Sequence, residues 1–276
     1  MLHKNIIIIF LLLVLISFGI VYGYYYFQWK SFWSIALPEP SYAISEKGDD
    51  TLRVIIIGDS WAALHSDLGM DDYLLSLLKH DIMRPITIAS RGKGGEKSRG
   101  IYEHMFETNG CGTKSLFQKG VDYCVISAGI NDAAANIGPK QFCAHYRMIL
   151  NFLLAHNIRP IIIEVPDVDL WNLYKEKPKK DLLVDYLRST MTQCGMYNYS
   201  EYREALNKML KEENLLESVI YIPMREWNGK ETKLNDELFM SDRIHLNKKG
   251  YKRLDASIAN AIVRDLEQAQ DTAFVN

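Results

Sequence analysis

Three short segments of the chain carry side chains that together could perform acyl-transfer chemistry. Gly58-Asp59-Ser60 supplies a serine, Gly129-Ile130-Asn131-Asp132 a side-chain amide, and Asp242-Arg243-Ile244-His245 a carboxylate and an imidazole. These groups are a nucleophile, a donor for a developing oxyanion, and a base with the group that orients it. Each segment alone has a structural explanation: a helix cap, an Asn loop bonded to its own backbone, and a surface histidine beside an aspartate. Their joint order favours a serine hydrolase.

Strand-like and helix-like segments alternate along the chain, and this alternation would bring the three segments together. Apolar runs predict strands, and apolar periodicity predicts helices at about 62–79, 139–156 and 248–266; the strands are Leu52–Ile57, Pro85–Ala89, Val121–Ser127, Arg159–Val165 and Val219–Ile222. The pattern predicts a three-layer α/β/α sandwich with a doubly wound, about five-stranded parallel sheet. Because Ser60 and Asn131 follow strands within a few residues, both are expected at the carboxyl ends of the sheet, where such folds bind ligands.

A glycine-rich turn, Ser90–Ser98, follows the second predicted strand. Its three glycines allow the backbone to approach a ligand closely. Four basic residues in and beside the turn make phosphate binding a rival interpretation, but neither a P-loop nor a dinucleotide fingerprint matches; the four are Arg91, Lys93, Lys97 and Arg99. Their charges are either solvated or favour an anionic substrate.

No Gly-x-Ser-x-Gly nucleophile elbow occurs, which disfavours the α/β-hydrolase fold. Instead, the segments around Ser60, Ser90–Ser98, Asn131 and Asp242–His245 resemble blocks I, II, III and V of the SGNH, or GDSL-like, hydrolase superfamily. The resemblance covers about 52–266 and implies a flavodoxin-like SGNH fold. It departs from the family pattern at Trp61, where many members have Leu, and at Ser90, where many have Asn.

The resemblance also implies a role for each site residue. Ser60 would be the nucleophile, and Asp242 and His245 would complete the triad. The oxyanion hole would consist of the backbone N–H groups of Ser60 and Gly95 and the side-chain amide of Asn131. Gly92 and Gly94 are alternatives to Gly95 for the second donor. Asp132 is expected to be structural. The resemblance implies no metal or organic cofactor.

The N-terminal segment Ile6–Phe27 is uncharged and almost wholly apolar. As a helix it would span roughly 33 Å, enough for a bilayer core of about 30 Å. Aromatic residues suited to a membrane interface follow it, and bulky tyrosines occupy the place of a signal-peptide cleavage site, so an uncleaved anchor is favoured over a cleaved signal peptide. Under either interpretation, the rest of the chain is exported from the cytoplasm. We therefore expect a cytoplasmic tail at 1–5, an anchor at 6–27, a linker at 28–51, a hydrolase domain at 52–268 and a tail at 269–276.

Composition excludes some classes of protein. The chain has 276 residues, with 32 basic and 34 acidic side chains and a net charge of −2, so nucleic-acid binding is disfavoured. One or two disulfides could form in an exported domain among Cys111, Cys124, Cys143 and Cys194. Cys124 lies in a predicted buried strand, where a free thiol is the favoured interpretation. The spacing Cys143-Ala144-His145 does not suit a zinc site.

The resemblance implies esterase chemistry and leaves the substrate open. An anchored, extracytoplasmic enzyme suggests O-acyl groups on surface carbohydrate or lipid, with removal of O-acetyl esters from carbohydrate as the first choice. One alternative is an O-acyltransferase that modifies surface polysaccharide with the same triad and a partner that supplies the acyl donor. Another is a non-catalytic carbohydrate-binding or assembly protein, which would have no need of the Asp/His pair. The aromatic-rich stretch 166–217 is either a helical insertion or lid, or ordinary packed helix.

Overall fold

The computed structural model describes residues 2–29, 42–45, 47–168, 170–224, 227 and 237–275. The chain divides into two units, 1–38 and 39–276. The first contains the helix α1 (Leu2–Gln28), whose segment His3–Gln28 includes an 18-residue window with a mean hydropathy of 3.0. Length and composition allow this helix to cross a membrane, although an N-terminal signal sequence has the same properties. The predicted linker at 28–51 lies partly outside the described residues.

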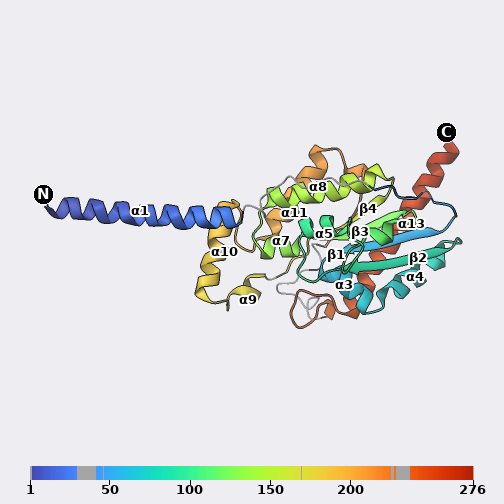
Figure 1. Ribbon diagram of the computed structural model, residues 1–276. Coiled ribbons are helices and arrows are strands. Elements are labelled where there is room, and N and C mark those ends of the chain that lie inside the picture. The colour runs from blue at the N-terminus through green and yellow to red at the C-terminus, as the bar shows by residue number, and fades with distance from the viewer. Residues whose placement is uncertain are drawn as a thin grey trace. The chain divides into compact units, whose positions relative to one another are not determined.

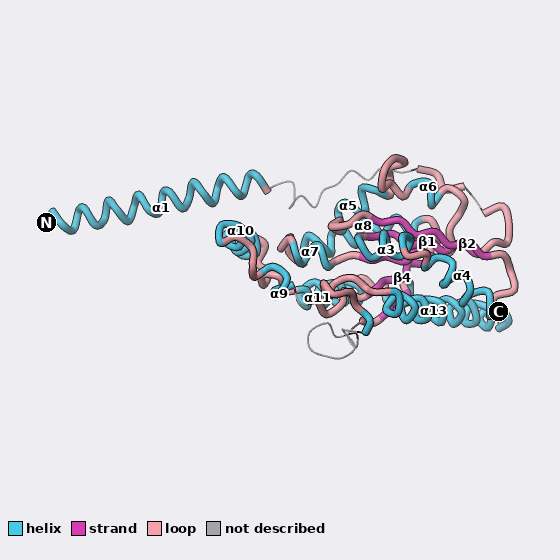
Figure 2. The backbone as a smooth tube through the Cα atoms, turned by 90° about the horizontal axis from the view of Figure 1, so that it is seen from below, coloured by secondary structure: helices cyan, strands magenta, loops and turns pink. Residues whose placement is uncertain are grey.

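The second unit is built on a five-stranded parallel sheet with the strand order β2-β1-β3-β4-β5 (Figures 1 and 2). The strands are β1 (Leu52–Gly58), β2 (Ile86–Gly92), β3 (Tyr123–Ser127), β4 (Arg159–Ile163) and β5 (Ile220–Ile222). Gly58, at the end of β1, pairs in register with Gly92 on one side and Ser127 on the other. The sequence prediction of a doubly wound parallel sheet is confirmed, and three chain segments leave the sheet side by side.

Helices cover both faces of the sheet (Figure 1). One group consists of α3 (Ser60–Asp67), α4 (Met70–Asp81) and α13 (Lys248–Val275), and the other of α5 (Ser98–His104), α8 (Pro139–Ala155) and α11 (Tyr199–Glu212). The other helices of the described residues are short or connect these layers: α6 (Lys114–Phe117), α7 (Ile130–Ala134), α9 (Leu170–Tyr174), α10 (Lys179–Met191) and the 3₁₀ helix η1 (Leu216–Ser218). The strands β1 and β3 are buried almost throughout, as expected for a sheet between two helical layers.

Three elements differ from the sequence prediction. The helix expected at 62–79 is two helices, because Gly69 adopts a left-handed φ of 69° and breaks the turn between α3 and α4. The strand β2 continues past Ala89 to Gly92, pairing with β1 along its whole length. The last helix begins at Lys248 as expected but continues to Val275, through most of the segment predicted as a tail.

All four cysteines are free thiols, so the disulfides considered from sequence do not occur in the structure. They lie on separate elements, with Cys124 in β3, Cys143 in α8 and the other two in connections. Cys124 is fully buried, and burial raises the pKa of its thiol. The expectation that Cys124 serves as a small apolar core residue is confirmed.

Candidate active site

Ser60 is the first residue of α3 and follows β1 with only Asp59 between them. The buried carboxylate of Asp59 caps the helix: its Oδ1 accepts hydrogen bonds from the backbone N–H of Trp61 and the hydroxyl of Ser127, both at 3.0 Å. Burial raises the pKa of Asp59 to about 6. Because Asp59 performs the capping, the Ser60 hydroxyl is available for another partner.

That partner is His245. Its Nε2 lies 2.9 Å from Ser60 Oγ, and its Nδ1 lies 2.6 Å from Asp242 Oδ2. The second oxygen of Asp242 accepts the backbone N–H groups of Ile244 at 2.9 Å and His245 at 3.0 Å. Although partial burial acts to raise the pKa of Asp242, the hydrogen bonds from His245 and the backbone hold it below its usual value. The sequence-predicted residues therefore form a continuous hydrogen-bonded relay.

A tight turn in the connection before α13 gives Asp242 and His245 this geometry. Phe239 and Leu246 form an antiparallel bridge, and the backbone N–H of Met240 donates to the carbonyl of His245 at 2.7 Å. Arg243, between the two site residues, has a left-handed φ of 58°.

The indole Nε1–H of Trp61 donates to the carbonyl of Ile244 at 3.0 Å. Trp61, a departure from the family pattern, thus links the serine helix directly to the turn that carries His245.

Asn131 is the second residue of α7, which begins directly after Gly129, two residues past the end of β3. Its side-chain Nδ2 donates to Asp59 Oδ2 at 3.4 Å, which places the amide beside the residue that precedes Ser60. Gly129 has a φ of 123°, and a Cβ there would lie 2.5 Å from a methyl group of Val165, so the turn requires glycine.

Asp132 is fully buried and joins two of the motif-bearing loops. Its carboxylate accepts the backbone N–H of Ser98 at 3.0 Å and the hydroxyl of Ser98 at 2.6 Å. Burial raises the pKa of Asp132 to about 6. Ser98 is the last residue of the glycine-rich turn and the first of α5, so Asp132 positions that turn relative to Asn131. This geometry agrees with the structural role expected for Asp132.

The three glycines of the turn serve different purposes. Gly92 ends β2 against α3, where a Cβ would lie 2.3 Å from the carbonyl of Asp59 and 2.7 Å from the backbone nitrogen of Ala63. Gly95 has a left-handed φ of 75°, whereas a Cβ on Gly94 would meet nothing within 4 Å. Only Gly92 is therefore required for close packing, and Gly95 stays the candidate oxyanion donor.

Three of the four basic side chains near this turn have partners. Lys93 lies 2.7 Å from Glu96, Arg99 lies 2.9 Å from Glu103, and Arg91 donates to the carbonyl of Gly112 at 2.7 Å. Because carboxylates pair with Lys93 and Arg99 and a backbone carbonyl holds Arg91, the structure gives little support to the phosphate-binding interpretation.

A buried cluster around His65 escaped the sequence analysis. His65 Nδ1 lies 2.9 Å from Asp71 Oδ1, and Nε2 lies 2.8 Å from Asp255 Oδ1. Ser90, the other departure from the family pattern, lies 2.9 Å from His65 through its hydroxyl and donates its backbone N–H to Asp71 at 3.1 Å. The cluster joins α3, α4, β2 and α13. Asp255 lies 190 residues from His65, so local spacing gave no signal for it.

The two carboxylates determine the charge state of His65. Burial alone would lower the pKa of the imidazole, but hydrogen bonds and attraction from Asp255 and Asp71 raise it to about 9. The pKa of Asp71 is held below its usual value by His65 and Ser90 despite partial burial. Burial raises the pKa of Asp255, whose Oδ2 has no partner among the described residues. His65 is therefore an imidazolium at neutral pH.

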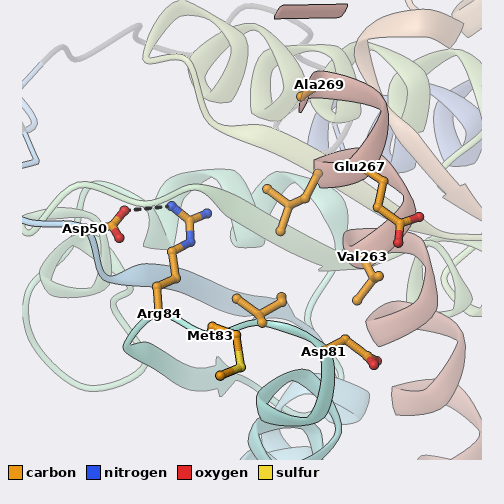
Figure 3. A pocket seen from close by; sticks show the side chains of 9 residues that line it. Asp50, Asp81, Met83, Arg84, Val263, Glu267 and Ala269 are labelled. Atoms are coloured by element: carbon orange, nitrogen blue, oxygen red, sulfur yellow. Dashed lines mark hydrogen bonds and ion pairs between the residues drawn. The ribbon is translucent and has the colours of Figure 1, made fainter. Parts of the chain in front are cut away.

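A pocket of about 920 Å³ lies away from these residues, between the end of α4 and α13 (Figure 3). Met83, Val263 and Glu267 line it, and Arg84 lies 3.2 Å from Asp50 at its side. Arg84 precedes β2, so the pocket lies at the amino end of that strand, opposite Ser60. No serine, cysteine or histidine is among the described residues that line it. Among the described residues, no group of three or more His, Cys, Asp or Glu side chains is placed to hold a metal ion.

The SGNH class of hydrolases consists of parallel α/β/α sandwiches that bring together a nucleophilic serine, an asparagine amide and an Asp/His pair. This chain is one of them. It belongs to the GDSL-like lipase/acylhydrolase family, whose sequence profile matches residues 56–253. The chain is accordingly a serine hydrolase that acts on ester bonds.

Solved structures share the fold at low sequence identity. The lipase/acylhydrolase from Enterococcus faecalis is 20% identical, with a TM-score of 0.54 over 78% of this chain and 96% of that one. The acetyl xylan esterase AlAXEase is 18% identical, with a TM-score of 0.55 over 76% of this chain and 100% of that one. The psychrotrophic esterase EstA from Pseudoalteromonas sp. is 16% identical, with a TM-score of 0.52 and coverages of 79% and 100%. A search of curated protein sequences finds no match.

Proposed function

We propose that the protein is a membrane-anchored, extracytoplasmic serine esterase that removes O-acyl groups, O-acetyl first among them, from carbohydrate or lipid. The observation that carries the proposal is the hydrogen-bonded relay from Ser60 through His245 to Asp242. Its distances fall within the range that a nucleophile and its base require.

In the first step, His245 Nε2 accepts the proton of Ser60 Oγ while that oxygen attacks the ester carbonyl. Asp242 stabilises the imidazolium that forms. The backbone N–H groups of Ser60 and Gly95 and the amide of Asn131 hold the oxyanion, and the N-terminus of α3 adds a favourable dipole. His245 then protonates the leaving alcohol, which leaves an acyl group on Ser60. Water, activated by His245, releases the acid and restores the serine.

Two observations support the proposed substrate and location. The apolar helix α1 is long enough to hold the domain at a membrane if it is retained. One structural relative is an acetyl xylan esterase, which makes carbohydrate acetyl esters the first class to test. A non-catalytic binding protein would not need the complete relay, so the relay argues against that alternative.

The test compares the full chain in mild detergent with Ser60→Ala on an aryl acetate and on acetylated oligosaccharides. Wild type should release acetate from both, and Ser60→Ala should release none above background. Ser76→Ala, an exposed serine on α4, is the matched control and should retain the wild-type rate. A Ser60→Ala variant with wild-type rates would refute the mechanism. Acetyl transfer to added sugar in excess of release to water would instead identify an acyltransferase. The N-terminal peptide, detected by mass spectrometry of membrane fractions, tests whether α1 is retained.

A further inference from the structure

The segment between β4 and α11 exposes an unusual concentration of apolar side chains. Outside α1, six large apolar side chains are exposed among the described residues, and four of them lie on α9 and α10. Their exposed fractions are 53% for Trp171, 42% for Leu173, 58% for Leu183 and 59% for Tyr186. We call these four residues the α9–α10 face.

The inner side of this helix pair is already packed. Lys177 Nζ lies 2.8 Å from Asp185 and 4.1 Å from the ring centroid of Tyr174. The rings of Tyr174 and Trp171 lie 5.0 Å and 6.2 Å from the buried ring of Tyr197. The two helices are thus held together, and the exposed apolar groups are not the loosely packed edge of a core.

The same helices lie at the end of the domain that carries α7, with α10 next to α7 (Figures 1 and 2). Arg188 donates to the carbonyl of Ala135 at 3.1 Å, and Thr192 donates to the carbonyl of Asn136 at 3.0 Å. These carbonyls follow α7, whose first turn contains Asn131. The position of the α9–α10 face is therefore fixed relative to the site.

The charges around the face suit a lipid surface. Three exposed lysines, Lys175, Lys179 and Lys180, lie between and beside the apolar groups and outnumber the two exposed carboxylates of the same stretch, Glu176 and Asp181. Aromatic and leucine side chains interleaved with lysines are typical of surfaces that lie at a membrane interface, where the rings enter the head-group region and the lysines meet anionic phosphates.

The chain itself would keep this face within reach of a bilayer. Tyr42 belongs to the domain, since its hydroxyl donates to the carbonyl of Met105 and its ring packs against Phe106 and Phe152. The connection from Gln28 to Tyr42 can extend at most about 50 Å at roughly 3.5 Å per residue. A tether of this length gives the face a high effective concentration at the membrane.

We propose that the α9–α10 face docks on the interfacial region of a lipid bilayer, and that docking presents the active site to ester groups displayed close to the membrane. The inference rests on the membrane anchorage proposed above. Trp171, Leu173, Leu183 and Tyr186 enter the head-group region, and the three lysines strengthen binding to anionic lipid.

The test uses the full chain in nanodiscs of phosphatidylcholine with a minor share of phosphatidylglycerol, with or without brominated acyl chains. The fluorescence of Trp171 is obtained by subtracting the emission spectrum of Trp171→Phe from that of wild type. If the face docks, brominated lipid should quench most of this Trp171 fluorescence. Equal intensity in the two kinds of nanodisc would overturn the proposal.

Matched variants separate docking from a general surface effect. Replacing Leu173, Leu183 and Tyr186 together with Ser should abolish the quenching of Trp171, whereas Met83→Ser with Leu216→Ser, two exposed apolar side chains elsewhere, should leave it unchanged. Equal quenching of Trp171 in the triple variant and in the Met83/Leu216 control variant would contradict the proposal. Replacing the three lysines with Gln should weaken quenching only when phosphatidylglycerol is present.

Two further readouts distinguish failure of this inference from failure of the proposed function. Co-elution with nanodiscs reports the anchor, and aryl acetate hydrolysis reports the esterase. If the chain co-elutes and hydrolyses the ester while Trp171 stays unquenched, only the docking proposal fails. If the chain does not co-elute, the anchorage and the docking both fail, whatever the rate of hydrolysis.

Discussion

The buried imidazolium of His65 predicts that the domain loses stability as the pH rises through the mildly alkaline range. His65 is 2% exposed and Asp255 is fully buried, so solvent screens their attraction little. Folding raises the pKa of His65 from 6.5 to about 9. At about 1.4 kcal/mol for each tenfold change in proton affinity, the charged form contributes about 3 kcal/mol to the free energy of unfolding.

The sign follows from which state binds the proton. Below pH 6.5 both the folded and the unfolded chain carry the charge, and the full contribution is present. Between pH 6.5 and about 9 only the folded chain holds the proton, so stability falls as the pH rises. The groups that face His65 are Asp71, Asp255, the Ser90 hydroxyl and the ring of Tyr251.

The assay is urea unfolding of the full chain in mild detergent at pH 6, 7, 8 and 9, followed by fluorescence. The reference variant is His65→Gln with Asp255→Asn, which keeps similar volumes without leaving a buried carboxylate unpaired. The difference in unfolding free energy between wild type and this variant should shrink by about 3 kcal/mol from pH 6 to pH 9. His80→Gln, at a position 85% exposed, should show no such trend. A difference that stays constant across this range would refute the assigned charge state.

Three further predictions concern the site and its supports. Asn131→Ala should lower kcat by roughly 10²–10³ with little effect on KM, measured by aryl acetate kinetics; an unchanged kcat would remove Asn131 from the oxyanion hole. Asp242→Asn should lower kcat by about 10⁴ while the unfolding temperature stays near wild type, because the base loses its orienting carboxylate; a kcat within about tenfold of wild type would contradict the relay. Gly92→Ala should destabilise the domain by about 1–3 kcal/mol through overlap with α3, whereas Gly94→Ala should change stability by less than about 0.5 kcal/mol, measured by thermal unfolding; equal effects would contradict the packing assigned to Gly92.

Local patterns predicted the elements that carry the chemistry. The apolar runs identified the strands, and because parallel strands end at one edge, Ser60 and Asn131 were expected to converge there. The structure adds His245 to the same place, although it lies 185 residues from Ser60 in sequence. The three-residue spacing of Asp242 and His245 indicated an oriented base, and the resemblance of the motifs assigned that base to Ser60.

The features that escaped prediction depend on tertiary contacts. A single glycine in a helical pattern is compatible with a continuous helix, so the break at Gly69 required the backbone conformation itself. The cluster around His65 unites residues from four elements. The bond from Trp61 to Ile244 spans 183 residues. These contacts explain the departures at Trp61 and Ser90, because each side chain connects motif-bearing elements in this chain.

The central claim is that Ser60 is a nucleophile activated by His245, and covalent labelling tests it most directly. The full chain is treated with a fluorophosphonate, and the site of the adduct is identified by mass spectrometry of its peptides. The account predicts one adduct on Ser60 in wild type, and none in Ser60→Ala or, at the same exposure time, in His245→Ala. A folded wild-type chain that forms no adduct, or forms it on a residue other than Ser60, would contradict the claim.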